Sequence, residues 1–301
     1  MSDHKAFLSA LPEETRRALT ERSDGHGLAR LALHLGLIAA IGVWIAAEGP
    51  FWAALLPLQG VLIVFLFTLQ HECTHKTPFR SEWVNEAVGR LSGLMILQPF
   101  EWFRYYHLAH HRHTGDPGRD PELAGGPRRG WAAFWIGLSG WGYWRHNIGV
   151  LIANAAGRPG PHAPARAAGR IAWEARLMLA LYLLAALSFV WTDALLWAWL
   201  APMAIGMPAL RLYLLAEHGR CPMVADMFAN TRTTFTNAVV RFVAWNMPYH
   251  TEHHVFPAVP FHRLPDLARL MSGKRENEAQ GFRRFAARYV AGIGREREGE
   301  R

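Results

Sequence analysis

Four long apolar blocks dominate the pattern of hydrophobic and polar positions along the chain. A helix needs about 20 largely apolar residues to cross the hydrocarbon core of a bilayer, and each block has this length. The blocks are 28–47, 51–70, 173–192 and 194–216. Trp residues near their ends favour membrane spans over the core helices of a soluble bundle. Only short turns (48–50 and 191–193) separate the members of each pair, so the pattern predicts two transmembrane hairpins.

The region between the two hairpins is mixed. Residues 83–103 and 130–152 are apolar and rich in Trp, but Gly interrupts them, so we expect helices that lie at the membrane interface. Pro and Gly predict a loop over 155–170. Together with the four spans, this predicts an all-α integral membrane protein with a helical cap.

The basic residues indicate which side of the membrane the cap occupies. Lys and Arg gather in 1–27, 76–172 and 217–301 and are missing from the two short turns. Positive residues stay on the cytoplasmic side, so both termini and the cap should be cytoplasmic, at the inner membrane if the source is bacterial. The net charge of +8 then fits a basic surface against anionic lipid. No nucleic-acid motif accompanies it, and we expect no nucleic-acid partner.

Histidine is the most unusual component, with 16 copies. Three motifs, HECTH (71–75), HLAHH (107–111) and HTEHH (250–254), place imidazoles three or four residues apart, which is one face of a helix. The predicted topology brings all three to the cytoplasmic side, together with His218 at the end of the fourth span. The candidate metal ligands are His71, His75, His107, His110, His111, His218, His250, His253 and His254.

The sequence indicates the identity of the metal less directly than it indicates the ligands. HECTH alone is the H-E-x-x-H pattern of a zinc hydrolase, with Glu72 as general base. One zinc ion takes about four ligands, so nine imidazoles are too many for a single zinc. Imidazole also suits iron, and the count favours a pair of irons.

The three motifs and the placement of the spans resemble those of the membrane fatty acid desaturase superfamily over about residues 28–270. The resemblance implies that the nine histidines hold two irons (Fe²⁺/Fe³⁺) that react with O₂. It also implies an oxidoreductase that attacks an unactivated C–H bond. The expected domains are a cytoplasmic segment (1–27), the membrane di-iron domain (28–270) and a basic cytoplasmic tail (271–301).

The leading expectation is a desaturase or hydroxylase of a fatty-acyl lipid. The same superfamily includes carotenoid hydroxylases and ketolases, and oxygenases or demethylases of small molecules, which stay open. From other classes, a membrane zinc protease using HECTH and a metal-binding protein without chemistry are the alternatives.

Several polar residues near the motifs are candidates for hydrogen bonds to metal-bound histidines, which usually donate their second N–H to a carboxylate or carbonyl. A solvated or ion-paired role is the alternative for each acid, and a turn role for Asp116 and Asp120. The candidates are His113, Glu72, Glu101, Asp116, Asp120, Glu217, Glu252 and Asn246.

Electrons must come from a partner, since no haem, iron–sulfur or nucleotide motif is seen in the sequence. We expect an external ferredoxin or similar donor. An acidic donor would be steered by the basic cap, to which the tail 273–301 contributes.

Overall fold

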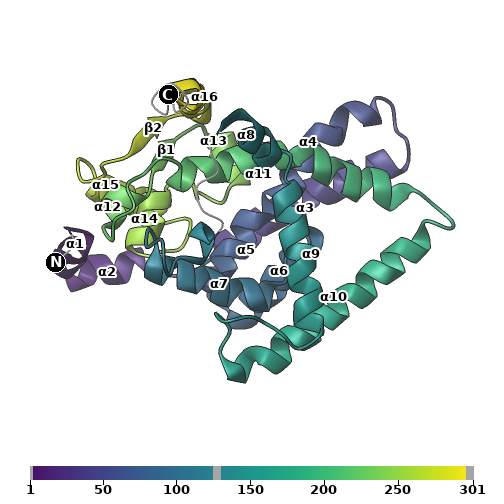
Figure 1. Ribbon diagram of the computed structural model, residues 1–301, viewed down its shortest axis with the longest axis horizontal. Coiled ribbons are helices and arrows are strands. Elements are labelled where there is room, and N and C mark those ends of the chain that lie inside the picture. Colours follow the sequence, from purple (N-terminus) through teal and green to yellow (C-terminus); the bar gives the residue numbers. More distant parts are fainter. Residues whose placement is uncertain (1–2, 125–129, 296–301) are drawn as a thin grey trace.

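The computed structural model describes residues 3–124 and 130–295, and it is mostly helical (Figure 1). Four helical stretches are long and apolar enough to cross a membrane: Glu13–Ala46, Trp52–Thr74, Ala165–Ser188 and Leu196–His218. Each overlaps most of one of the four predicted blocks, so the prediction of four candidate spans is confirmed.

Each span is built from shorter elements, and the breaks have local causes. The first comprises α2 (Glu13–Leu19) and α3 (Asp24–Ala46), which begins after Ser23 because that side chain caps the helix by accepting from the N–H of His26. The other three contain η1 (Trp52–Leu55), α4 (Leu56–Val64) and α5 (Leu66–Thr74); η3 (Ala165–Ala167) and α10 (Ala168–Ser188); and η4 (Leu196–Leu200) and α11 (Ala201–His218).

The closest packing between spans joins α4 to α11. A methyl group added at Gly60 would lie 2.0 Å from the backbone oxygen of Pro202, and one added at Gly206 would lie 2.3 Å from the carbonyl carbon of Gly60. Small residues allow such close backbone approach between membrane helices. The buried Gln59 amide adds polar links, donating to the carbonyls of Ile38 on α3 and Ala198 on η4. These contacts join three of the four spans.

The remaining span, which contains α10, packs elsewhere. It lies against α9 (Trp141–Ala155), and α11 diverges from it after the turn that joins them (Figure 1). The two helices of the second predicted hairpin are therefore consecutive but are not packed along their lengths. The loop predicted over 155–170 is shorter than expected, because η3 and α10 begin within it.

The apolar segment 83–103 forms parts of two helices rather than one. α6 (Glu82–Met95) ends before Leu97, whose φ is +60°, and α7 (Phe100–His113) begins after Pro99. Proline fixes its own φ and disfavours helical backbone in the residue before it, which explains the break. α8 (Gly130–Leu138) and α9 likewise divide the segment 130–152.

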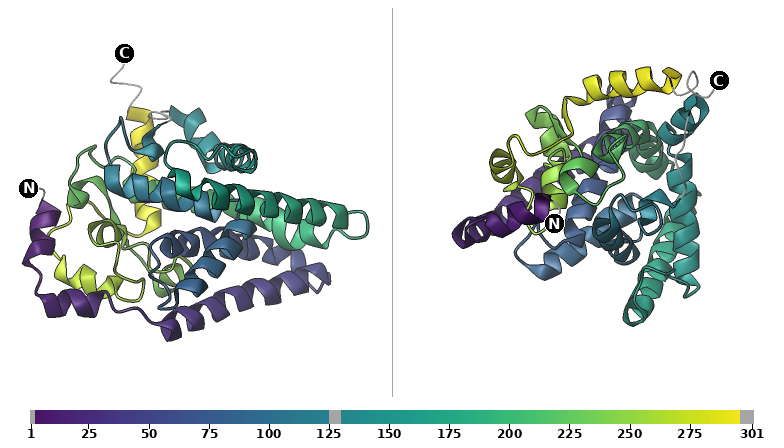
Figure 2. Two further views of the ribbon diagram at one scale, coloured as in Figure 1. Left: turned by 90° about the horizontal axis from the view of Figure 1, so that it is seen from below. Right: turned by 60° about the vertical axis from the view of Figure 1, so that its left-hand side comes forward.

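A small parallel sheet corrects the all-α expectation. β1 (Thr233–Phe235) pairs with β2 (Glu278–Gln280), with Thr233 opposite Glu278. Three-residue strands are too short to show an alternating pattern in sequence. The remaining elements are α1 (Asp3–Ala10), η2 (Pro121–Leu123), α12 (Met227–Asn230), α13 (Ala238–Val243), α14 (His250–Val255), α15 (Leu264–Leu270) and α16 (Phe282–Arg295). The sheet, α1, α12, α14 and α15 gather at the end of the molecule away from the α10–α11 turn (Figures 1 and 2).

Candidate metal centre

The nine predicted histidines converge from four segments. α5 carries His71 and is followed directly by His75, and His218 is the last residue of α11. α7 supplies three histidines in its last two turns, and α14 supplies the other three. Six of the nine are buried and three are half-buried. The ends of two candidate spans therefore meet the two shorter helices α7 and α14.

The nitrogens fall into two groups, each of which could hold a metal ion. One group is His71, His75, His107, His111 and His253, and the other is His110, His218 and His254. Within each group the candidate ligand atoms lie within 4.8 Å of one another. His250 joins the second group through His218, with their Nε2 atoms 2.9 Å apart.

Other Nε2 pairs have similar spacing: 3.0 Å for His75 and His107, and 3.2 Å for His111 and His253. Two imidazoles at right angles on one ion, each about 2.1 Å from it, would have nitrogens about 3 Å apart. The spacing therefore suits neighbouring ligands of a shared cation.

Some of these nitrogens have no partner among the described residues. Both ring nitrogens of buried His71 lack a hydrogen bond, as does Nε2 of buried His254. A buried polar atom without a partner is rare and costly. A metal ion would satisfy one nitrogen of each of these rings, so the donor set fits one.

Burial also keeps most of the imidazoles in the form that binds metal. Desolvation lowers the pKa of His75 to about 3 and holds those of His107, His111, His253 and His254 well below the ordinary value. Neutral imidazole is the ligand. His110 differs. Burial lowers its pKa, but the carboxylates of Glu122 and Asp120 outweigh that effect and raise it.

A ring of acceptors faces the Nδ1 atoms. Asp120 Oδ1 lies 2.9 Å from His110, and the Asn230 carbonyl oxygen lies 3.0 Å from His218. Glu217 lies 3.3 Å from Nδ1 of His250, Glu72 lies 3.5 Å from that of His253, and Thr114 Oγ1 lies 3.4 Å from that of His254. Such partners orient metal-bound histidines and leave Nε2 for the metal.

Glu72 is placed for that role and not for proton transfer in an open cleft. Its side chain is buried, and Oε2 accepts from the Thr77 hydroxyl at 3.0 Å and from the Phe261 N–H at 3.1 Å. Oε1 is the atom that faces His253. A general base of a zinc hydrolase must reach the attacking water; these contacts occupy Glu72 with structural partners.

Other predicted candidates lie outside the two groups. Asp116 accepts from the Gly118 N–H and pairs with Arg119, so the structure favours its turn role. The Asn246 amide donates to the Phe261 carbonyl, and the Glu252 carboxylate contacts Arg275 and Thr233. His113 is the half-buried last residue of α7 and belongs to neither group.

Two of the acceptors were missed by sequence reasoning. A backbone carbonyl, such as that of Asn230, carries no residue-type signal. Thr114 lies directly after HLAHHRH, and its hydroxyl also donates to the His110 carbonyl. Its distance along the chain from His254 hides the second contact.

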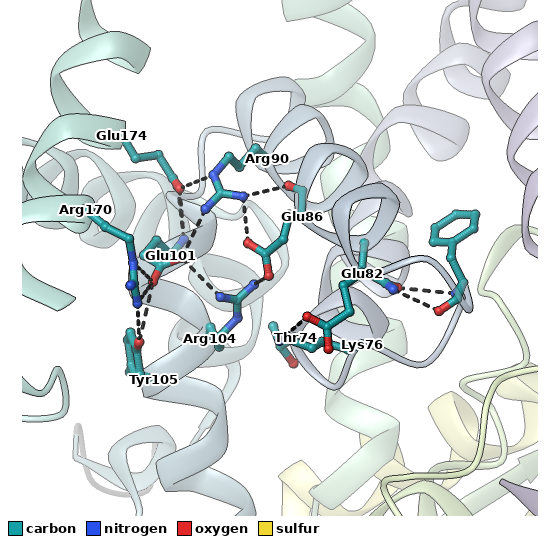
Figure 3. A network of polar contacts seen from close by, with 12 residues as sticks. Thr74, Lys76, Glu82, Glu86, Arg90, Glu101, Arg104, Tyr105, Arg170 and Glu174 are labelled. Carbon is teal, nitrogen blue, oxygen red and sulfur yellow. Dashed lines mark hydrogen bonds and ion pairs between the residues drawn. The ribbon is translucent and has the colours of Figure 1, made fainter. Parts of the chain in front are cut away.

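The remaining predicted acid, Glu101, belongs to a charged network that holds α7 in place (Figure 3). Its carboxylate pairs with Arg90, Arg104 and Arg170, and Glu86 pairs with Arg90 and Arg104. The network joins α6, α7 and α10 next to the helix that supplies three histidines. The network therefore favours an ion-paired role for Glu101 over a hydrogen bond to a candidate metal-binding histidine.

Comparison with known families agrees with this site. The model of the family described as "Fatty acid desaturase" matches residues 50–286, which include all nine histidines. The chain belongs to the fatty acid desaturase family, and the resemblance inferred from the three motifs is confirmed.

Individual relatives match shorter stretches. An sn-1 oleoyl-lipid 12-desaturase of Picosynechococcus is 33% identical over 93 residues, 30% of this chain and 27% of the relative. An sn-1 acyl-lipid omega-3 desaturase (ferredoxin) of Nostoc is 34% identical over 70 residues, which cover 23% of this chain and 18% of the relative. A second 12-desaturase, from Anabaena variabilis, is 30% identical over 125 residues, covering 38% and 32%. Each match spans a third or less of the relative's length.

Proposed function

We propose that this protein is a membrane-bound, O₂-dependent di-iron oxidoreductase that desaturates the fatty-acyl chain of a lipid. The observation that carries the proposal is the pair of mostly buried histidine groups, whose candidate ligand nitrogens converge within 4.8 Å in each group, in a chain of the fatty acid desaturase family. The acyl-lipid substrates in the names of its relatives support the substrate class.

The proposed ligands are the nine histidines, with His250 completing the smaller group. Imidazole ligands whose outer Nδ1 atoms face carboxylates suit iron. When bound, iron supplies the activation of O₂ needed to break an unactivated C–H bond. The protein contributes fixed ligand geometry through Asp120, Glu217 and Glu72, and burial that keeps bulk water away.

Hydroxylation of the same chain, or oxidation of a carotenoid or small molecule, would use the same site, and product analysis separates these reactions. The zinc protease alternative is disfavoured because Glu72 is hydrogen-bonded to Thr77 and Phe261 and faces the outer nitrogen of His253.

The proposed orientation places both termini and the metal centre on the cytoplasmic side, following the distribution of basic residues. The proposed electron donor is a ferredoxin or similar acidic protein. Arg283, Arg284 and Arg288 are exposed on α16 and give it a basic face for such a donor. The printed name of the Nostoc relative, which includes ferredoxin, supports this choice.

Metal analysis of the purified protein tests the core of the proposal. We expect about two irons per chain. His254→Ala should reduce the content toward about one by weakening the smaller group, and His253→Ala should reduce it through the larger group. His113→Ala is the matched control, since His113 lies outside both groups, and it should retain the wild-type iron content.

About one zinc per chain, retained in His253→Ala, would contradict the di-iron site and support the hydrolase alternative. If iron is found, lipid extracts from a host expressing wild type or His253→Ala identify the reaction. New double bonds confined to the wild type support desaturation. Hydroxylated chains in their place would assign the hydroxylase reaction instead.

A further inference from the structure

A groove separate from the metal centre lies between α7, α9 and the loop that follows α9. Its volume is about 1020 Å³, and its apolar lining includes Trp102, Tyr106, Trp141 and Val150. The size and lining are those of a site for a sizeable apolar ligand. The nine histidines are not among the residues that line it.

The charged side chains at the groove are both basic. Arg145 on α9 and Arg158 in the following loop line it and are exposed. Neither guanidinium has a hydrogen bond or ion pair with any residue that the structure describes, whereas Arg90 and Arg104 pair with carboxylates. Two unpaired arginines beside an apolar floor suit an amphipathic anion.

The groove also contains a buried donor without a partner. Asn154 lines it, is 1% exposed, and its Nδ2 has no hydrogen-bond partner within the described part of the chain. A buried amide N–H left unpaired costs about 1–3 kcal/mol. An acceptor oxygen of a bound molecule would satisfy it.

The surroundings place this groove beside the bilayer. α9 packs on α10, a candidate span, and exposes Ile148 and Ile152. Trp141 at the start of α9 is also largely exposed, as is typical of aromatic residues at a membrane interface. A ligand that enters here comes from the interfacial layer of the membrane.

We propose that the groove binds an anionic phospholipid of the bilayer. The headgroup phosphate accepts hydrogen bonds from Arg145 and Arg158, an ester carbonyl accepts from Asn154, and an acyl chain covers the apolar floor. The binding requires no metal and does not depend on the proposed reaction.

Native mass spectrometry of the full chain in neutral detergent tests this site, with dioleoylphosphatidylglycerol and dioleoylphosphatidylcholine as probes. The wild type should bind the anionic lipid roughly tenfold more tightly, and Arg145→Gln with Arg158→Gln should abolish this preference. Arg80→Gln with Arg166→Gln is the matched control; it removes two positive charges from exposed arginines outside the groove and should keep the preference.

Asn154→Leu provides an independent variant. It keeps the branched shape of the side chain and removes the unpaired amide, so affinity for both lipids should fall several-fold, and thermal unfolding checks that the variant is folded. The proposal would be overturned if the wild type bound both lipids equally, or if the groove double variant kept the same preference for the anionic lipid as the control variant. Unchanged affinity in Asn154→Leu would also overturn it. Iron content, measured on the same samples, should be unchanged, which keeps the result separate from the test of the metal centre.

Discussion

The Glu174 carboxylate on α10 accepts a hydrogen bond from the backbone N–H of Glu101, in the first turn of α7, at 3.0 Å. Glu174 is therefore a cap supplied from a distant segment, and it also pairs with Arg90 at 3.2 Å. The N-terminal N–H groups of a helix have no partner within the helix, and the ring of Pro99 has no polar atom to cap them. This contact ties the helix that carries His107, His110 and His111 to a candidate span.

Removal of this cap should loosen α7. Glu174→Ala should lower stability by about 1–2 kcal/mol, the usual cost of a lost cap, and should also reduce retained metal because three ligands lie on that helix. Thermal unfolding in detergent and metal content check the two effects. Glu82→Gln is the control, since the Lys76–Glu82 pair is exposed and such pairs contribute little. Equal behaviour of the two variants would contradict the capping role.

The contact between α4 and α11 predicts intolerance of a single methyl group. Gly60→Ala would place Cβ 2.0 Å from the Pro202 oxygen, and backbone atoms cannot move aside cheaply. We expect a loss of about 1–3 kcal/mol, as for overpacked cores, and a lower melting temperature. At Gly36 on α3 a Cβ would meet nothing within 4 Å. Gly36→Ala should therefore be neutral or slightly stabilising; a similar loss in both variants would refute the close contact.

His262 predicts a pH dependence of stability. Burial, together with His26 and Arg263, lowers its pKa to about 4, whereas an unfolded histidine titrates near 6.5. Between these values the unfolded chain binds more protons than the folded one, so this contribution to stability is present above about pH 6.5 and is lost as pH falls toward about 4. His262→Gln should flatten the fall in melting temperature across that window. Identical slopes for variant and wild type would exclude His262 as a contributor.

Much of this molecule was predictable because its two strongest features are local in sequence. Apolar blocks of span length and closely spaced histidines each fall within about 20 residues, and both predicted the corresponding structure. The nine histidines are brought together by the ends of α5 and α11 and by α7 and α14.

The features that were missed depend on contacts between distant segments. The Nδ1 of His218 faces a backbone carbonyl, and Thr114 reaches His254 across 140 positions. Pairing of β1 with β2 and the packing of α10 on α9 also require the folded chain. Asp116 and Asp120 have the same residue type and lie four positions apart, so sequence alone could not say which one faces a histidine.

That pair supplies the sharpest test of how the metal centre is supported. Asp120 Oδ1 lies 2.9 Å from His110 Nδ1, and Oδ2 accepts from the Gly115 N–H, whereas Asp116 pairs with Arg119. Loss of such a carboxylate typically weakens metal binding by about 10–100-fold. Asp120→Ala should therefore lose bound metal at a lower chelator concentration than the wild type, and Asp116→Ala should match the wild type. Equal metal retention by the two variants would show that His110 does not need the Asp120 carboxylate to hold metal.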